Sequence, residues 1–221
     1  MVRISSALLH VNAICVMTYG YKALNGLSIN TWIESQYGGH FQFLTIQGLA
    51  VAWLTMFIGL VEDFFPSIYG VRVVKRSLFI IAMPTETIIS SIYWTLLLTF
   101  PHLILQGMPS ESASTSVIQR IPLRMDLALH AAPALALLAD FMIFERRYRK
   151  ADILYVAPVL TFLCTMWYGW WAEHCASING TFPYPFLTQN PLEIRLRIYA
   201  GAGTVAFLSF YALNILHPSS Y

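Results

Sequence analysis

Charged residues are scarce in this chain. Aspartate, glutamate, lysine and arginine make up 11% of its 221 residues, whereas hydrophobic residues make up 57%. So little polar surface excludes a water-soluble globule, and a mean hydropathy of +0.60 is typical of a protein that lies in a bilayer. The net charge of +2 gives no basis for binding nucleic acid and suits contact with anionic lipid headgroups.

Cysteine is also scarce, with only Cys15, Cys164 and Cys175 in the chain. The first two fall within long apolar stretches, which leaves no pattern typical of a disulfide framework or a thiolate metal site. We therefore expect no metal and no cofactor.

Six apolar stretches are each long enough to cross the hydrocarbon core as a helix, which takes about 20 residues. Their continuity favours helices over the strands of a barrel, which would alternate apolar and polar residues. The sequence predicts an all-α polytopic membrane protein, with residues 1–221 forming a single bundle of six transmembrane helices. The expected spans are 4–24, 41–64, 77–100, 125–144, 153–171 and 198–216.

Lysine and arginine are concentrated in two short connections, those after the second and fourth spans. Basic residues of short loops stay on the cytosolic side, so we expect both termini there. The three longer connections, near 25–40, 101–124 and 172–196, then face the lumen or the exterior.

Thr45 and His130 are the residues that suggest chemistry. They lie about 6 Å and about 9 Å inside the same face of the membrane. A hydroxyl and an imidazole at similar depth can act as nucleophile and base in ester hydrolysis. Asp126 precedes His130 by one helical turn and could hold its tautomer. Gly48 follows Thr45 by about one turn and would leave room for substrate.

Each of these polar residues also has a simpler interpretation. A threonine in a membrane helix usually bonds the carbonyl one turn back or bridges to a neighbour, so Thr45 is weak evidence by itself. A buried histidine such as His130 is more often functional. Glu86 lies near mid-membrane, and its simpler role is a carboxyl bonded to backbone freed by Pro84. Asn12 is either a donor to the reacting oxygen or a structural group.

Five segments along the chain occur in the order and spacing of one family of membrane proteins. The set resembles the androgen-induced membrane protein family, which includes the androgen-dependent regulator of tissue factor pathway inhibitor. The matching segments are Gly38-Gly39-His40-Phe41-Gln42-Phe43-Leu44-Thr45, Val61-Glu62-Asp63, Arg76 with Pro84 and Tyr93-Trp94, Ile121-Pro122 with His130, and Tyr184-Pro185-Phe186-Leu187.

This resemblance implies an integral-membrane hydrolase of fatty-acid esters of hydroxy fatty acids, with Thr45 and His130 as the catalytic residues. Its partner would be a long-chain lipid ester, and we expect the endoplasmic reticulum before the plasma membrane. The chain departs from the family pattern at Asp126, where the family tends to carry asparagine. The candidate substrate-binding residues are Gly48, Asp126, Asn12, Glu86 and Trp94.

Two other classes of protein remain open from the sequence. In a non-enzymatic lipid carrier, Thr45 and His130 would only line a pocket. A haem-binding electron carrier needs two histidines at equal depth, and His130 with His174 is the pair that the expected non-cytosolic side offers.

Overall fold

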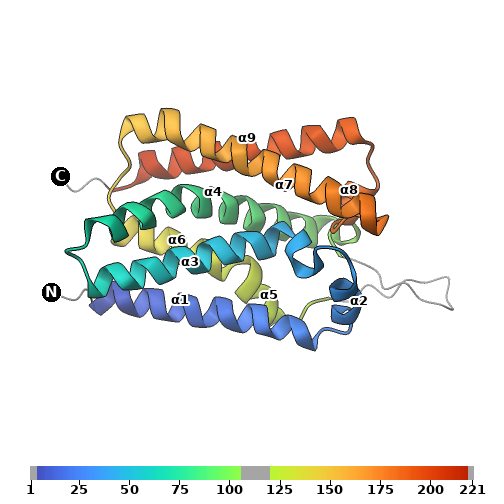
Figure 1. Ribbon diagram of the computed structural model, residues 1–221, viewed down its shortest axis with the longest axis horizontal. Helices are drawn as coiled ribbons and strands as arrows, with labels where there is room; N and C mark the ends of the chain where they lie inside the picture. The colour runs from blue at the N-terminus through green and yellow to red at the C-terminus, as the bar shows by residue number, and fades with distance from the viewer. Residues whose placement is uncertain (1–3, 106–119, 219–221) are drawn as a thin grey trace.

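The computed structural model describes residues 4–105 and 120–218 and confirms the all-α architecture, since these residues form helices and no strand. The long helices run up and down in sequence order, so both termini lie at one end of the bundle (Figure 1). They are α1 (Ile4–Ala23), α3 (Leu44–Phe64), α4 (Tyr69–Thr99), α5 (Leu123–His130), α6 (Ala132–Ile143), α7 (Ala157–Asn179) and α9 (Leu192–Leu216).

Short helical turns make up most of the opposite end of the bundle, and this end is called the site end below. They are η1 (Leu24–Gly26), α2 (Asn30–Ser35), η2 (Gly39–Gln42), η3 (Pro101–Leu103) and α8 (Pro185–Thr188). At the end with the termini, a π-helical turn, η4 (Asp152–Val156), leads directly into α7.

Four of the described helical stretches are long and apolar enough to cross a membrane, and a fifth is added if the bent pair α5 and α6 counts as one span. The helix α1 falls short of this criterion because polar residues such as His10 and Asn12 lower its hydropathy. A polytopic membrane protein is therefore confirmed, whereas the predicted count of six crossings is not.

Two helices begin earlier than their apolar stretches. The expected third span started at residue 77, but α4 begins at Tyr69 because the side chains of its first turns find acidic partners, as in the 2.8 Å pair of Arg72 with Glu62. The last helix begins at Leu192 rather than at 198. There Arg195 forms two 2.7 Å hydrogen bonds with Glu173 of α7.

The helices pack in two groups. One group surrounds a core in which Met17, Met56, Phe79 and Phe141 are almost fully buried, and it consists of α1, α3, α4 and the pair α5 and α6. The second group is α7 with α9, which pack against each other and against α4 (Figure 1). Helix α4 therefore lies between the two groups.

The break between α5 and α6 follows from Pro133. Proline has no N–H to give to the carbonyl of Leu129, and its ring crowds that carbonyl, so the helix bends by 43° at Ala131. His130 is consequently the last residue of α5. The indole N–H of Trp94 donates to the His130 carbonyl at 3.3 Å.

Ionisable side chains form a buried network at the end that carries the termini. His10 of α1 lies between two carboxylates, with Nδ1 2.6 Å from Asp63 of α3 and Nε2 3.3 Å from Asp140 of α6. The ammonium of Lys75, on α4, is 2.9 Å from Asp140 and 2.8 Å from Glu145. These groups, named the ionic network below, connect four helices through charges that are shielded from solvent.

Candidate active site

Thr45 is the second residue of α3 and is 8% exposed. The first backbone N–H groups of a helix have no intrahelical partner. The phenol oxygen of Tyr184 fills this role, since it lies 3.5 Å from both the backbone nitrogen and Oγ1 of Thr45. The residue therefore presents a hydroxyl and a backbone N–H side by side.

The Thr45 hydroxyl is not bonded to its own helix, in contrast to several other helical threonines. Thr55, Thr87 and Thr165 each donate to the carbonyl one turn back, at 2.7 to 2.8 Å. For Thr45 that carbonyl is on Phe41, where it accepts from Gln47 at 2.8 Å and from Trp171 at 2.9 Å. That carbonyl is already occupied, so the Thr45 hydroxyl does not bond it and instead bridges to a neighbouring segment at Tyr184.

His130 is held on three sides. Its Nδ1 lies 2.8 Å from Oδ1 of Asp126, one turn earlier on α5. Its ring stacks on Tyr93 of α4, with centroids 3.4 Å apart and an interplanar angle of 3°. With Nδ1 engaged and the backbone carbonyl bonded to Trp94, Nε2 is the ring atom left for proton exchange.

Thr45 and His130 line one cavity at the site end, which we name the end cavity. No described hydrogen bond joins the two side chains. Helices α3 and α5 contact each other, which the sequence could not show. The rest of the lining is mainly aliphatic, and His40 and Arg120 are its basic members.

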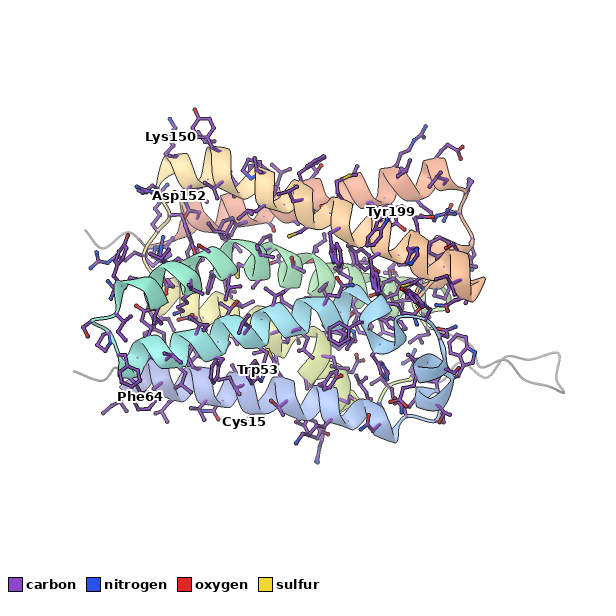
Figure 2. All side chains as sticks on the ribbon, in the orientation of Figure 1. Cys15, Trp53, Phe64, Lys150, Asp152 and Tyr199 are labelled. Atoms are coloured by element: carbon purple, nitrogen blue, oxygen red, sulfur yellow. The ribbon has the colours of Figure 1, made fainter. Side chains whose placement is uncertain are left out.

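A second cavity, named the interhelix cavity, lies between α4, α7 and α9. Thr45, Tyr93, Ile104 and Tyr184 line both cavities. Figure 2 shows Tyr199, another of its lining residues, toward the site end and far from Lys150 and Asp152. Thr45 therefore lies where the two cavities meet.

None of the five candidate substrate-binding residues lines either cavity, and Asp126 acts only through its contact with His130. Asn12 is exposed on α1 and donates to the Leu8 carbonyl of its own helix at 2.7 Å, so it lies apart from the site. Trp94 lines neither cavity and instead supports the His130 backbone. Gly48 faces side chains of α4.

Side chains of α4 fill the space beside Gly48. A Cβ at this position would lie 2.5 Å from Cδ1 of Ile89 and 2.8 Å from Oε1 of Glu86. The glycine thus allows α3 and α4 to approach and leaves no room for substrate there. Glu86 is fully buried, and neither carboxyl oxygen has a hydrogen-bond partner among the described residues, so the bond to backbone freed by Pro84 is not present.

The two histidines of the haem hypothesis do not share a cavity. The ring of His174 stacks on Trp170 at 5.5 Å and makes an edge contact with Tyr37 at 5.3 Å. His174 lines neither of the cavities described above. The pairing with His130 that this hypothesis needs is therefore not formed.

Tyr184 was not among the residues expected at the site. It comes from the connection between α7 and α8, 139 residues after Thr45, and only the family resemblance drew attention to its segment. Burial raises the pKa of the Tyr184 phenol, and the hydrogen bonds with Thr45 oppose this shift only in part. The phenol therefore stays neutral at physiological pH and can donate a hydrogen bond.

The fold and the site together define an all-α membrane protein with a threonine and a histidine in one apolar cavity inside the bundle. The family model of the FAR-17a/AIG1-like proteins matches residues 5–218. The chain belongs to this family.

Two yeast proteins are similar to this chain over nearly its whole length, and both are named UPF0641 membrane proteins. The one from Schizosaccharomyces pombe is 29% identical over 219 residues, covering 98% of this chain and 92% of its own. The one from Saccharomyces cerevisiae is 25% identical over 215 residues, covering 92% and 88% respectively. No solved structure matches the chain.

Proposed function

We propose that the protein is an integral-membrane hydrolase that cleaves fatty-acid esters of hydroxy fatty acids. The observation that carries this proposal is the Thr45 hydroxyl, which is not bonded to its own helix and lines the same cavity as a histidine oriented by Asp126. Family membership agrees with a membrane protein, and the aliphatic cavities suit a long-chain lipid. We propose the endoplasmic reticulum as its membrane because its substrate is a lipid.

In the proposed reaction, Oγ1 of Thr45 attacks the ester carbonyl carbon while Nε2 of His130 takes its proton, directly or through one water molecule. The tetrahedral intermediate collapses, and His130 returns the proton to the leaving alcohol oxygen. Water then attacks the acyl-threonine, with His130 again as the base, and the fatty acid leaves. Asp126 accepts from Nδ1–H and so favours the tautomer with a free Nε2.

The negative oxygen of the intermediate needs hydrogen-bond donors close to Thr45. Two candidates lie there: the backbone N–H of Thr45 at the beginning of α3, and the neutral phenol of Tyr184. The positive end of the α3 dipole adds to their effect. Removing one donor of this kind costs an acyl-transfer enzyme about 10²- to 10³-fold in kcat.

The test is hydrolysis of a branched fatty-acid ester of a hydroxy fatty acid by detergent-purified protein. We expect Thr45→Ala and His130→Ala each to lower kcat by about a thousandfold or more, because each removes an essential part of one unit. Tyr184→Phe should lower it by about 10²-fold.

Matched controls separate chemistry from folding. Thr87→Ala removes a hydroxyl that is bonded to its own helix at a residue outside both cavities, and His174→Ala removes a ring outside both cavities. Both should retain turnover. Activity that survives in Thr45→Ala would exclude Thr45 as the nucleophile. Lipid binding without turnover, unaffected by either substitution, would identify a lipid carrier instead.

A further inference from the structure

The two cavities that meet at Thr45 differ in charge. Among the residues that line the interhelix cavity there is no aspartate, glutamate, lysine or arginine. Its lining residues on α4 extend from Ile80 to Tyr93, which is about 20 Å along the helix axis. An ionised group placed there would lose its hydration without a compensating charge. This cavity therefore suits an uncharged hydrocarbon chain.

The end cavity is equally aliphatic over most of its surface, but it has a basic side. His40 and Arg120 line it, and described acidic residues do not. Burial lowers the pKa of His40, an effect that the charge of Glu34 only partly offsets. His40 is therefore neutral at pH 7, and its Nε2 lies 2.6 Å from Oδ1 of Asn30.

Arg120 is the permanent cation of this lining. Its guanidinium stays protonated at any physiological pH and carries five N–H donors. Arg120 is exposed and makes no ion pair with a described residue. Asp126, the nearest described acid of the site, is already held by His130. Because Arg120 forms no ion pair within residues 4–105 and 120–218, it offers a bidentate donor to the end cavity.

We propose that Arg120 binds a carboxylate at the free end of the substrate, so that the acid-bearing chain occupies the end cavity and the plain acyl chain occupies the interhelix cavity. This inference rests on the proposed function. It assigns the two halves of the ester to two different places, with the reacting carbonyl between them at Thr45. Arg120 selects substrates with a free carboxylate and takes no part in the chemical step.

The test compares two substrates that differ in one group: an ester of a hydroxy fatty acid with its carboxylate free, and the same molecule with that carboxylate methylated. We expect wild-type protein to have a KM about tenfold lower for the free acid, because a charged hydrogen bond is lost in the methyl ester. Arg120→Gln should raise the KM for the free acid about tenfold and leave both kcat values and the methyl-ester KM within twofold.

Arg124→Gln is the matched control, since Arg124 is exposed, lies four residues further along and lines neither cavity. Arg124→Gln should leave the preference for the free acid intact. Arg120→Lys should retain part of the preference that Arg120→Gln loses. Equal KM values for the two substrates in wild type, or equal losses in Arg120→Gln and Arg124→Gln, would overturn the role of Arg120 while the hydrolase stands. Wild-type protein that cleaves neither substrate would overturn the proposed function and this inference with it.

Discussion

Asp126 can contribute to the site in two ways, by orienting the His130 ring and by supplying a negative charge. It lies 2.8 Å from Nδ1 of His130, yet the family that the chain resembles tends to carry asparagine at this position. Both side chains have an oxygen that accepts a hydrogen bond from Nδ1–H, and only the aspartate adds a negative charge. Comparing aspartate with asparagine at position 126 therefore separates orientation of the His130 ring from stabilisation of its positive charge.

We expect Asp126→Asn to retain kcat within about tenfold, because the amide oxygen keeps the imidazole in place. Asp126→Ala should lose about 10²-fold, since the ring is then free to turn and to change tautomer. Steady-state kinetics on detergent-purified variants measures both effects. If kcat falls equally in Asp126→Asn and Asp126→Ala, then Asp126 supplies charge rather than orientation.

The surroundings of the Thr45 hydroxyl illustrate what the sequence could and could not predict for single residues. The sequence predicted a similar depth in the membrane for Thr45 and His130, and both line the end cavity. That the Phe41 carbonyl is occupied depends on Trp171, 130 residues away, and Tyr184 approaches from a similar distance. Such contacts depend on which helices are neighbours, and hydropathy contains no information on that.

Among the elements, the bent pair of α5 and α6 decides where His130 lies. The apolar stretch 125–144 predicted one continuous span, and Pro133 converts it into two helices with a 43° bend immediately after His130. Hydropathy detects the apolar run but not the loss of one backbone donor within it. The early starts of α4 and α9 were missed for a related reason, because the charged residues there find partners on other helices.

Pro133→Ala should restore the missing donor, reduce the bend and turn His130 away from the end cavity. We expect kcat to fall at least about tenfold, since small displacements of a catalytic group are costly, while the melting temperature stays equal or rises. The control is Pro191→Ala, because Pro191 is exposed and immediately precedes α9, where no helical hydrogen bond is lost to the proline. Full activity in Pro133→Ala would show that the bend does not position the histidine.

For the whole molecule, the two ends of the bundle have different characters. The site end is closed by short turns around two apolar cavities, and the other end holds the ionic network. The network connects α1, α3, α4 and α6 through pairs with side chains at most 8% exposed, where water does not screen them. Removing one member therefore leaves a buried charge without its partner.

Lys75→Met should destabilise the fold by about 3 to 5 kcal/mol, because Asp140 and Glu145 then lose their shared cation. Thermal unfolding in detergent measures this change. Arg149→Met is the control: Arg149 pairs with Asp152 at 3.0 Å at the same end, but its side chain is 83% exposed. We expect its melting temperature to match the wild type, and equal shifts in both variants would contradict a special role for the buried pairs.

Because Tyr184 lies late in the chain, the site is completed only near the end of synthesis. Synthesis proceeds from the amino terminus, so Thr45 on α3 and His130 on α5 are complete before residue 184 is added. Until then the backbone N–H of Thr45 lacks its phenol neighbour, and the wall that α9 gives to the interhelix cavity is missing. A nascent chain thus carries Thr45 and His130 without the surroundings that the proposed chemistry needs. If the proposed function holds, esterase activity begins only when the last pair of helices packs against α4.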